Sequence, residues 1–125
     1  MNLAEMTDAV REVNEANGWH DDSLTFGDEV ALLHSEVSEM LEEFRKHGTK
    51  RYVQIDGEAV GLNDDEVLIH YGEGVKPLGV PSEAADVLIR LLDTCGRHGI
   101  DLEAEFHAKL AYNRTRGHRH GGKRL

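Results

Sequence analysis

Four glutamates fall within one short segment, LHSEVSEMLEEF at residues 33–44. Apolar residues recur every three to four positions through the same segment, which is typical of an amphipathic helix. On such a helix Glu36, Glu39 and Glu43 share one stripe beside the apolar face. Glu42 points elsewhere. Like charges at this spacing repel one another, so the stripe is either a solvated face or a place where a cation binds.

A second acidic pattern lies in PSEAADVLIRLLDTC, residues 81–95. Its apolar residues cover most of the circumference of a helix, which predicts a central and largely buried element. The polar exceptions align on one side, and they are Glu83, Asp86, Arg90 and Asp93. Carboxylates on a buried helix destabilise a fold by several kcal/mol unless something compensates them.

Both segments place two acids three residues apart. If the two helices pack with these pairs opposed, Glu36, Glu39, Glu83 and Asp86 converge. Four such carboxylates do not all stay ionised without a counter-charge. Mg²⁺ would supply it, because this ion prefers oxygen ligands and retains several waters. The competing explanation is a surface pattern in which Arg90 neutralises Glu83 or Asp86.

The end of the chain has the opposite charge. Lys109, Asn113 and Arg116 lie on one face of a predicted helix and offer an ammonium, an amide and a guanidinium, which suits phosphate oxygens. HGGK at 120–123 adds a glycine-rich backbone beside Lys123 that could approach a phosphate closely. A frayed terminus that contacts nothing is the alternative. Trp19 could stack on a nucleobase or simply pack.

Four helices must position these residues. The apolar periodicity predicts helices over about 2–17 and 28–47, a third from Pro81 or Ser82 to the Gly96–Gly99 region, and a fourth from near Asp101 to Gly117. The expected apolar positions of the second helix are Val30, Leu33, Val37, Leu41 and Phe44, and those of the fourth are Leu102, Phe106 and Leu110.

Residues 49–80 differ in character from the helices. The runs YVQI and VLIHY predict a small β-hairpin inserted between the two acidic helices, with DGEAVGLNDD as its turn. GEGVKPLGVP, which contains both prolines, is predicted to be a loop. Residues 117–125 form a basic, glycine-rich tail.

Composition limits the classes of function. The length of 125 residues predicts one domain over 1–125. Residues 1–105 contain all 24 acids and eight of the 14 Lys and Arg, which argues against general nucleic-acid binding. The first residues do not resemble a signal peptide, and no segment approaches a membrane span. The single cysteine, Cys95, fits a reducing cytoplasm, and the modest core favours self-association.

The ordered motifs resemble a known family. EVSE at 36–39 and EAAD at 83–86 are similar to the ExxE…ExxD signature of the MazG-like all-α nucleoside triphosphate pyrophosphohydrolases. KPLGVPSEAADVLIRLLD resembles the second acidic helix of that family. Lys109, Asn113 and Arg116 in KLAYNRTR resemble its KxxxNxxR element, and HGGK resembles the ending of small stand-alone members. One departure is that 43 residues separate Glu39 from Glu83, where compact relatives connect the helices more directly.

The resemblance implies a mainly α, four-to-five-helix bundle-like NTP pyrophosphatase fold with a small hairpin insertion. It implies Mg²⁺-dependent hydrolysis of a nucleoside or deoxynucleoside triphosphate to the monophosphate and pyrophosphate, with Mn²⁺ as a substitute ion. Glu36, Glu39, Glu83 and Asp86 would be the metal-binding and catalytic residues. Lys109, Asn113, Arg116 and Lys123 would bind the phosphates, with Trp19 as a further substrate contact, in a cytoplasmic homodimer or homotetramer.

Two other classes of protein also contain helices rich in acids. A di-iron carboxylate bundle needs Glu-x-x-His on two helices, and the sequence has no Glu followed by His three residues later. A non-catalytic acidic interaction module, whose basic tail docks a partner, remains the alternative to the enzyme.

Overall fold

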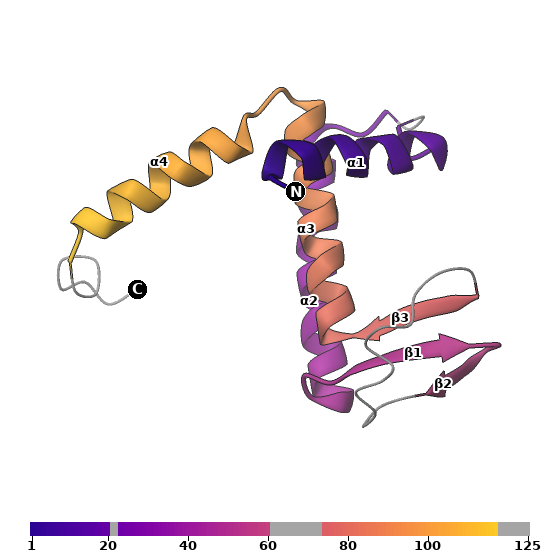
Figure 1. Cartoon of the computed structure of the whole chain (residues 1–125). Helices are drawn as coiled ribbons and strands as arrows, with labels where there is room; N and C mark the ends of the chain where they lie inside the picture. The colour runs from indigo at the N-terminus through magenta and orange to yellow at the C-terminus, as the bar shows by residue number, and fades with distance from the viewer. Residues whose placement is uncertain (21–22, 61–73, 118–125) are drawn as a thin grey trace. The chain divides into compact units, whose positions relative to one another are not determined.

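The computed structural model describes residues 1–20, 23–60 and 74–117 (Figure 1). Two compact units make up the chain: one is formed by residues 23–91, and the other by residues 1–22 and 92–125. The expectation of one domain over 1–125 stays a prediction.

The first unit begins with helix α2 (Phe26–His47). Thr25 caps this helix, because its hydroxyl accepts the backbone N–H of Asp28 at 3.1 Å while the Asp28 carboxylate accepts the backbone N–H of Thr25 at 3.0 Å. Gly48, with φ 65°, ends it. The predicted start near residue 28 was two residues late, since periodicity alone does not register the TFGD capping box.

Three strands follow α2: β1 (Arg51–Ile55), β2 (Glu58–Val60) and β3 (Val75–Gly79). They form one antiparallel sheet in the order β2-β1-β3. β1 and β2 are joined by Asp56 and Gly57, which have φ of 51° and 83°, as expected of a two-residue hairpin turn with both central residues in the left-handed region.

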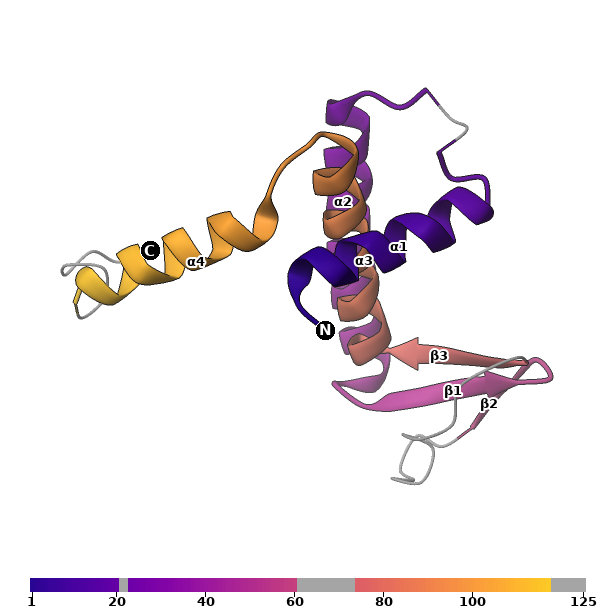
Figure 2. The same cartoon turned by 45° about the horizontal axis from the view of Figure 1, so that its top comes forward.

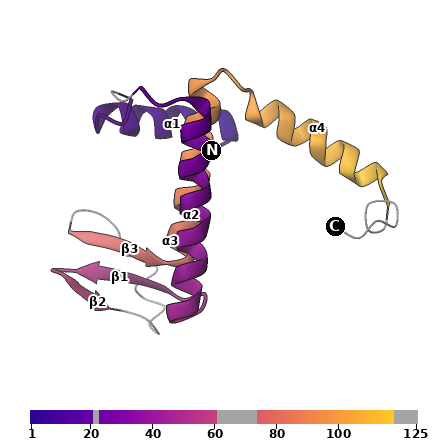
Figure 3. The ribbon, with the colours of Figure 1, turned by 180° about the vertical axis from the view of Figure 1, so that it is seen from behind.

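Helix α3 (Val80–Arg97) begins directly after β3. Its first turns run antiparallel to α2, and the sheet lies at the end of the pair where α2 stops and α3 starts (Figures 1 and 3). Because β1 follows α2 closely and β3 leads straight into α3, the pairing of Arg51 with Gly79 fixes the C-terminal end of one helix against the N-terminal end of the other.

The predicted fold is therefore wrong in its details. The described part of the chain has four helices and a three-stranded sheet, so it is mainly α but is not the expected bundle with a hairpin insertion. Residues 75–79, predicted to be a loop because of Pro77, form β3. An edge strand tolerates a proline, because a residue whose N–H would face away from the neighbouring strand donates no hydrogen bond to the sheet. The predicted strand VLIHY lies outside the described residues.

The second unit contains α1 (Leu3–Ala16), the end of α3 and α4 (Leu102–Thr115) (Figure 2). The backbone N–H of Leu3 donates to Glu103 Oε1 at 3.2 Å, which ties α1 to α4. α1 also passes close to α3 at Gly96, where an added Cβ would lie 2.5 Å from Arg11 Cδ and 2.9 Å from Thr7 Cγ2. A side chain at Gly96 would therefore displace the side chains of Arg11 and Thr7, which favours glycine there.

Burial differs from the expected pattern on α2. Val37, Leu41 and Phe44 are exposed, whereas Glu36, Met40 and Glu43 are half-buried. Two of the three acids of the stripe are thus partly shielded, while Glu39 and much of the apolar face are exposed to solvent. Leu88 and Ile89 on α3, and Phe106 and Leu110 on α4, are likewise exposed instead of buried. The buried apolar residues of the described chain are Tyr52, Val53, Leu92 and Cys95.

Among the described residues, no helix combines the length and the apolar character that a membrane crossing needs. Cys95 is a free, buried thiol, and burial raises its pKa. A buried thiol of this kind is typical of a packing residue.

Gly79 generates the first testable prediction. Its φ is 95°, and an added Cβ would overlap the backbone oxygen of Lys50 and approach Tyr52 Cδ1 to 3.3 Å. Gly79→Ala should lower the free energy of unfolding by about 2–4 kcal/mol, since backbone strain and steric overlap combine. Gly57→Ala, with φ 83° and nothing within 4 Å of the added atom, should show the strain alone, about 1–2 kcal/mol. If urea unfolding showed the same loss of unfolding free energy for Gly79→Ala and Gly57→Ala, the close packing of β3 on β1 would be contradicted.

Candidate functional site

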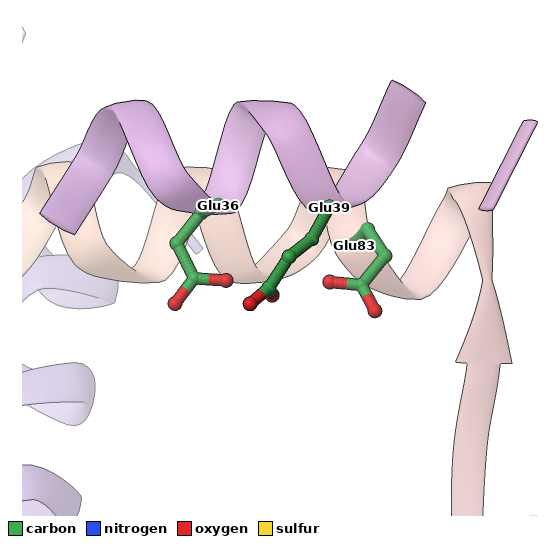
Figure 4. A group of neighbouring side chains, drawn as sticks. All are labelled: Glu36, Glu39 and Glu83. Atoms are coloured by element: carbon green, nitrogen blue, oxygen red, sulfur yellow. The ribbon is translucent and has the colours of Figure 1, made fainter. Parts of the chain in front are cut away.

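Three glutamates from two helices converge in the first unit. Glu36 and Glu39 lie on α2 and Glu83 lies on α3, and one carboxylate oxygen from each lies within 4.8 Å of the other two. Figure 4 shows the three side chains pointing to the same side of the helix pair. Glu36 and Glu83 are half-buried and Glu39 is exposed, so the group is open to solvent on one side.

Local structure explains this convergence. The spacing of three residues puts Glu36 and Glu39 on the same side of α2. Glu83 falls in the first turn of α3, immediately after the strand that pairs with β1. The junction between the sheet and the two helices therefore brings Glu83 beside a stripe of acids from which 43 intervening residues separate it, counted from Glu39.

Arg90 supplies positive charge at one end of the cluster. Its Nε and Nη2 donate to Glu36 Oε1 at 3.2 and 3.0 Å, and both side chains are largely shielded from solvent. The sequence suggested Glu83 or Asp86 as partners of Arg90, and the structure shows that Arg90 forms an ion pair with Glu36. Because both contacts use Oε1, Glu36 Oε2 does not take part in them.

Mutual repulsion perturbs the acids of the cluster. The pKa of Glu39 is raised, first by the negative charge of Glu36, then by a hydrogen bond with Glu36 and by desolvation. Partial burial raises the pKa of Glu83, and the charges of Asp86, Glu39, Glu36 and Glu43 raise it further. The ionised carboxylates thus destabilise one another in the protein alone.

Asp86 lies close to the three glutamates but outside the group whose oxygens are mutually within 4.8 Å. Desolvation and the charge of Glu36 raise its pKa, while Arg90 and Lys76 lower it. Lys76 is paired with Gln54 across the sheet, and Tyr52 is paired with Leu78. Directly opposed residues share a face, as do alternate residues along a strand, so Lys76 and Tyr52 project from the same face of the sheet.

Glu43 and Tyr52 were not among the predicted site residues. The hydroxyl of Tyr52 donates to Glu43 Oε1, and desolvation together with this bond raises the pKa of Tyr52 to about 12. Glu43 was visible in the sequence as a member of the acidic stripe. Tyr52 had no such signal, because its contact depends on how the sheet docks against α2.

These side chains fit a hard divalent cation by their chemistry. The donors are carboxylate oxygens, which Mg²⁺ and Mn²⁺ prefer. Adjacent ligands of one Mg²⁺ lie about 3 Å apart and opposite ligands about 4.2 Å apart, so the three oxygens, which lie within 4.8 Å of one another, would move closer together around an ion. A cation would also offset the repulsion that raises the pKa of Glu39 and of Glu83.

The predicted phosphate-binding residues lie on α4, in the other unit. Lys109 Nζ and Arg116 Cζ lie 5.7 and 5.5 Å from the centroid of the Tyr112 ring, so one exposed aromatic side chain contacts both cations. The backbone oxygen of Asn113 accepts the N–H of Arg116. This end of α4 is solvent-accessible and carries the expected combination of charges. Lys123 lies outside the described residues.

Trp19 is 52% exposed, which leaves part of its ring accessible to a ligand. The residue after it is anchored, because His20 Nε2 lies 2.9 Å from Asp93 Oδ1 and Asp93 is buried. Asp93 therefore tethers the segment that follows α1 and does not join the three glutamates. The sequence placed Asp93 among the aligned acids of α3, and this alignment gave no sign of its contact with His20.

No family model matches the chain, and comparisons with curated proteins and with solved structures also find no match. The fold is therefore not assigned to a family, and the resemblance to MazG-like enzymes stays a prediction carried by the motifs alone.

The raised pKa of Glu39 predicts how stability depends on pH. The folded protein keeps the proton of Glu39 above its ordinary pKa of 4.5, so the contribution of this group to folding is present below that pH and is lost as the pH rises. In EDTA, Glu39→Gln should therefore become more stable than the parent between about pH 4 and pH 7, as followed by urea unfolding.

Glu42→Gln is the matched control. Glu42 faces Arg45 at 3.5 Å and is exposed on the same helix, so this substitution removes an equal charge away from the cluster. A Glu39→Gln variant that is less stable than the parent at pH 7, or one that behaves like Glu42→Gln throughout, would contradict the proposed repulsion.

Proposed function

We propose that this protein is a Mg²⁺-dependent nucleoside triphosphate pyrophosphohydrolase, which releases a nucleoside or deoxynucleoside monophosphate and pyrophosphate. The observation that carries the proposal is the convergence of Glu36, Glu39 and Glu83 from two helices within 4.8 Å. The order of the EVSE, EAAD and KLAYNRTR motifs supports the same activity. Asp86 completes the predicted ligand set from its position beside Glu36.

In this reaction, different side chains of the chain would bind the ion, orient its ligands and accept a proton. Glu36, Glu39, Glu83 and Asp86 hold the ion, and Arg90 keeps the Glu36 side chain in place through two contacts to one oxygen. When bound, Mg²⁺ supplies positive charge to the triphosphate and lowers the pKa of a coordinated water. One carboxylate of the cluster accepts the proton of the attacking water. Lys76, on the sheet face nearby, adds positive charge to the same region.

Lys109, Asn113 and Arg116 are assigned to the phosphates, with Lys123 of the tail, and Trp19 to the base. We further propose that the protein is a homodimer or homotetramer. Val37, Leu41 and Phe44 follow one another at spacings of four and three residues along α2, and all three are exposed. This exposed apolar face supports the proposal, since such faces mark interaction surfaces. We place the activity in the cytoplasm, because the single cysteine fits a reducing compartment.

Loss of the metal ligands provides the direct test of the activity. Parent protein incubated with a panel of nucleoside and deoxynucleoside triphosphates should release pyrophosphate with Mg²⁺ and none with EDTA. Glu39→Gln and Asp86→Asn should each reduce kcat at least a hundredfold, because each removes a ligand of the ion. Both variants should remain folded by circular dichroism.

Glu42→Gln again serves as the control and should keep the parent rate. Parent-like hydrolysis by Glu39→Gln and Asp86→Asn would show that the metal site is misassigned. Absence of pyrophosphate release by the parent on every nucleotide would favour the non-catalytic acidic module instead.

The cations of α4 make a separate prediction. Charge-assisted contacts to phosphate contribute about 1.5–3 kcal/mol each, so Lys109→Gln and Arg116→Gln should each lower kcat/KM by roughly ten- to a hundredfold, mainly through KM. Arg114→Gln removes an equal charge from another face of the same helix and should change kcat/KM less than twofold. Equal effects at all three positions would indicate a general charge effect and contradict the assignment.

A further inference from the structure

The sheet contributes a side chain to the acidic site. Tyr52 is the second residue of β1, within the segment inserted between the acidic helices, and only 7% of it is exposed. Its hydroxyl donates to Glu43 Oε1 on α2. Glu43 follows Glu39 by one helical turn, so it extends the acidic stripe toward the end of α2 that meets the sheet.

The Tyr52 ring is held from two sides. The ring of His47 lies edge-on to it, with the two centroids 5.0 Å apart. Gly79 leaves no room for a side chain next to Tyr52 Cδ1. A buried ring with these neighbours has little freedom to turn, so the position of its hydroxyl, and through it that of the Glu43 carboxylate, is set by the packing of the sheet.

Glu43 in turn acts on the three clustered glutamates. It is half-buried, and its charge influences Glu83, which is the acid that α3 provides. The hydroxyl of Tyr52 holds the Glu43 carboxylate in one orientation through this hydrogen bond. Tyr52 therefore fixes the direction of a further acidic side chain whose charge acts on Glu83.

We propose that Tyr52 is a positioning residue which, through its hydrogen bond to Glu43, strengthens the binding of the divalent cation by Glu36, Glu39 and Glu83. This inference rests on the proposed function. It gives the sheet a role in the site that is transmitted through Glu43. Glu43 contributes fixed negative charge and orientation next to Glu83, and Tyr52 contributes only through Glu43.

A double-mutant cycle tests this proposal. Tyr52→Phe removes the hydroxyl and keeps the ring, Glu43→Gln removes the charge, and the double variant removes both. Mg²⁺ affinity is measured without substrate, from the rise in thermal unfolding temperature as Mg²⁺ is added. Groups that support a metal ligand from outside typically alter affinity by about 10–100-fold, so each single variant should bind Mg²⁺ roughly tenfold more weakly or worse.

The double variant should bind Mg²⁺ no more weakly than Glu43→Gln alone, because Tyr52 acts through Glu43. Hydrolysis supplies an independent measure: excess Mg²⁺ should return kcat of Tyr52→Phe to near the parent value, which it would not do for a fold defect. Glu42→Gln should match the parent in both assays.

Three outcomes would overturn the proposal: unchanged Mg²⁺ affinity in either single variant, losses that add up in the double variant, or a loss of kcat that excess Mg²⁺ does not restore. If Tyr52→Phe does not fold, the Mg²⁺ affinity of Glu43→Gln is compared with that of Glu42→Gln. Equal Mg²⁺ affinities of these two variants would overturn the proposal. Failure of the proposed function is distinguishable, because the parent itself would then show no Mg²⁺-dependent stabilisation or hydrolysis.

Discussion

Electrostatic repulsion between carboxylates held by two different helices is the constraint on which the rest of this structure depends. Glu36, Glu39 and Glu83 have oxygens within 4.8 Å of one another. The charge of Glu36 is the main cause that raises the pKa of Glu39, while partial burial and then the neighbouring charges raise the pKa of Glu83. Arg90 offsets the charge of Glu36. A fold that keeps such groups together must hold the helices from outside the cluster, and the antiparallel pairing of β1 with β3 does so.

The sheet thus fixes the end of α2 relative to the start of α3. β3 passes into α3 without an intervening residue, and Gly79 at that junction packs against the backbone of Lys50. Tyr52 and Val53, both buried, anchor the central strand. The same strand supplies the hydroxyl that binds Glu43, so the positions of Glu83 and Glu43 depend on one set of strand pairings.

Sequence reasoning identified the four helices and three of the acids that meet, because helical periodicity fixes which side chains share a stripe. It failed where long-range packing decides the outcome. VKPLG becomes a strand because its proline lies at the sheet edge, and Tyr52 reaches Glu43 only once the sheet has docked. The ion pair of Arg90 with Glu36 and the tether between His20 and Asp93 likewise depend on contacts between residues more than 50 positions apart.

The central claim is that the carboxylates of α2 and α3 jointly bind one divalent cation, and anomalous diffraction from crystals soaked in Mn²⁺ tests it most directly. The account predicts an anomalous peak bounded by Glu36, Glu39 and Glu83, with Arg90 still contacting Glu36, and no such peak in Glu39→Gln crystals soaked in the same way. A parent crystal without density for Mn²⁺ at this position, or with the ion bound elsewhere on the chain, would contradict it.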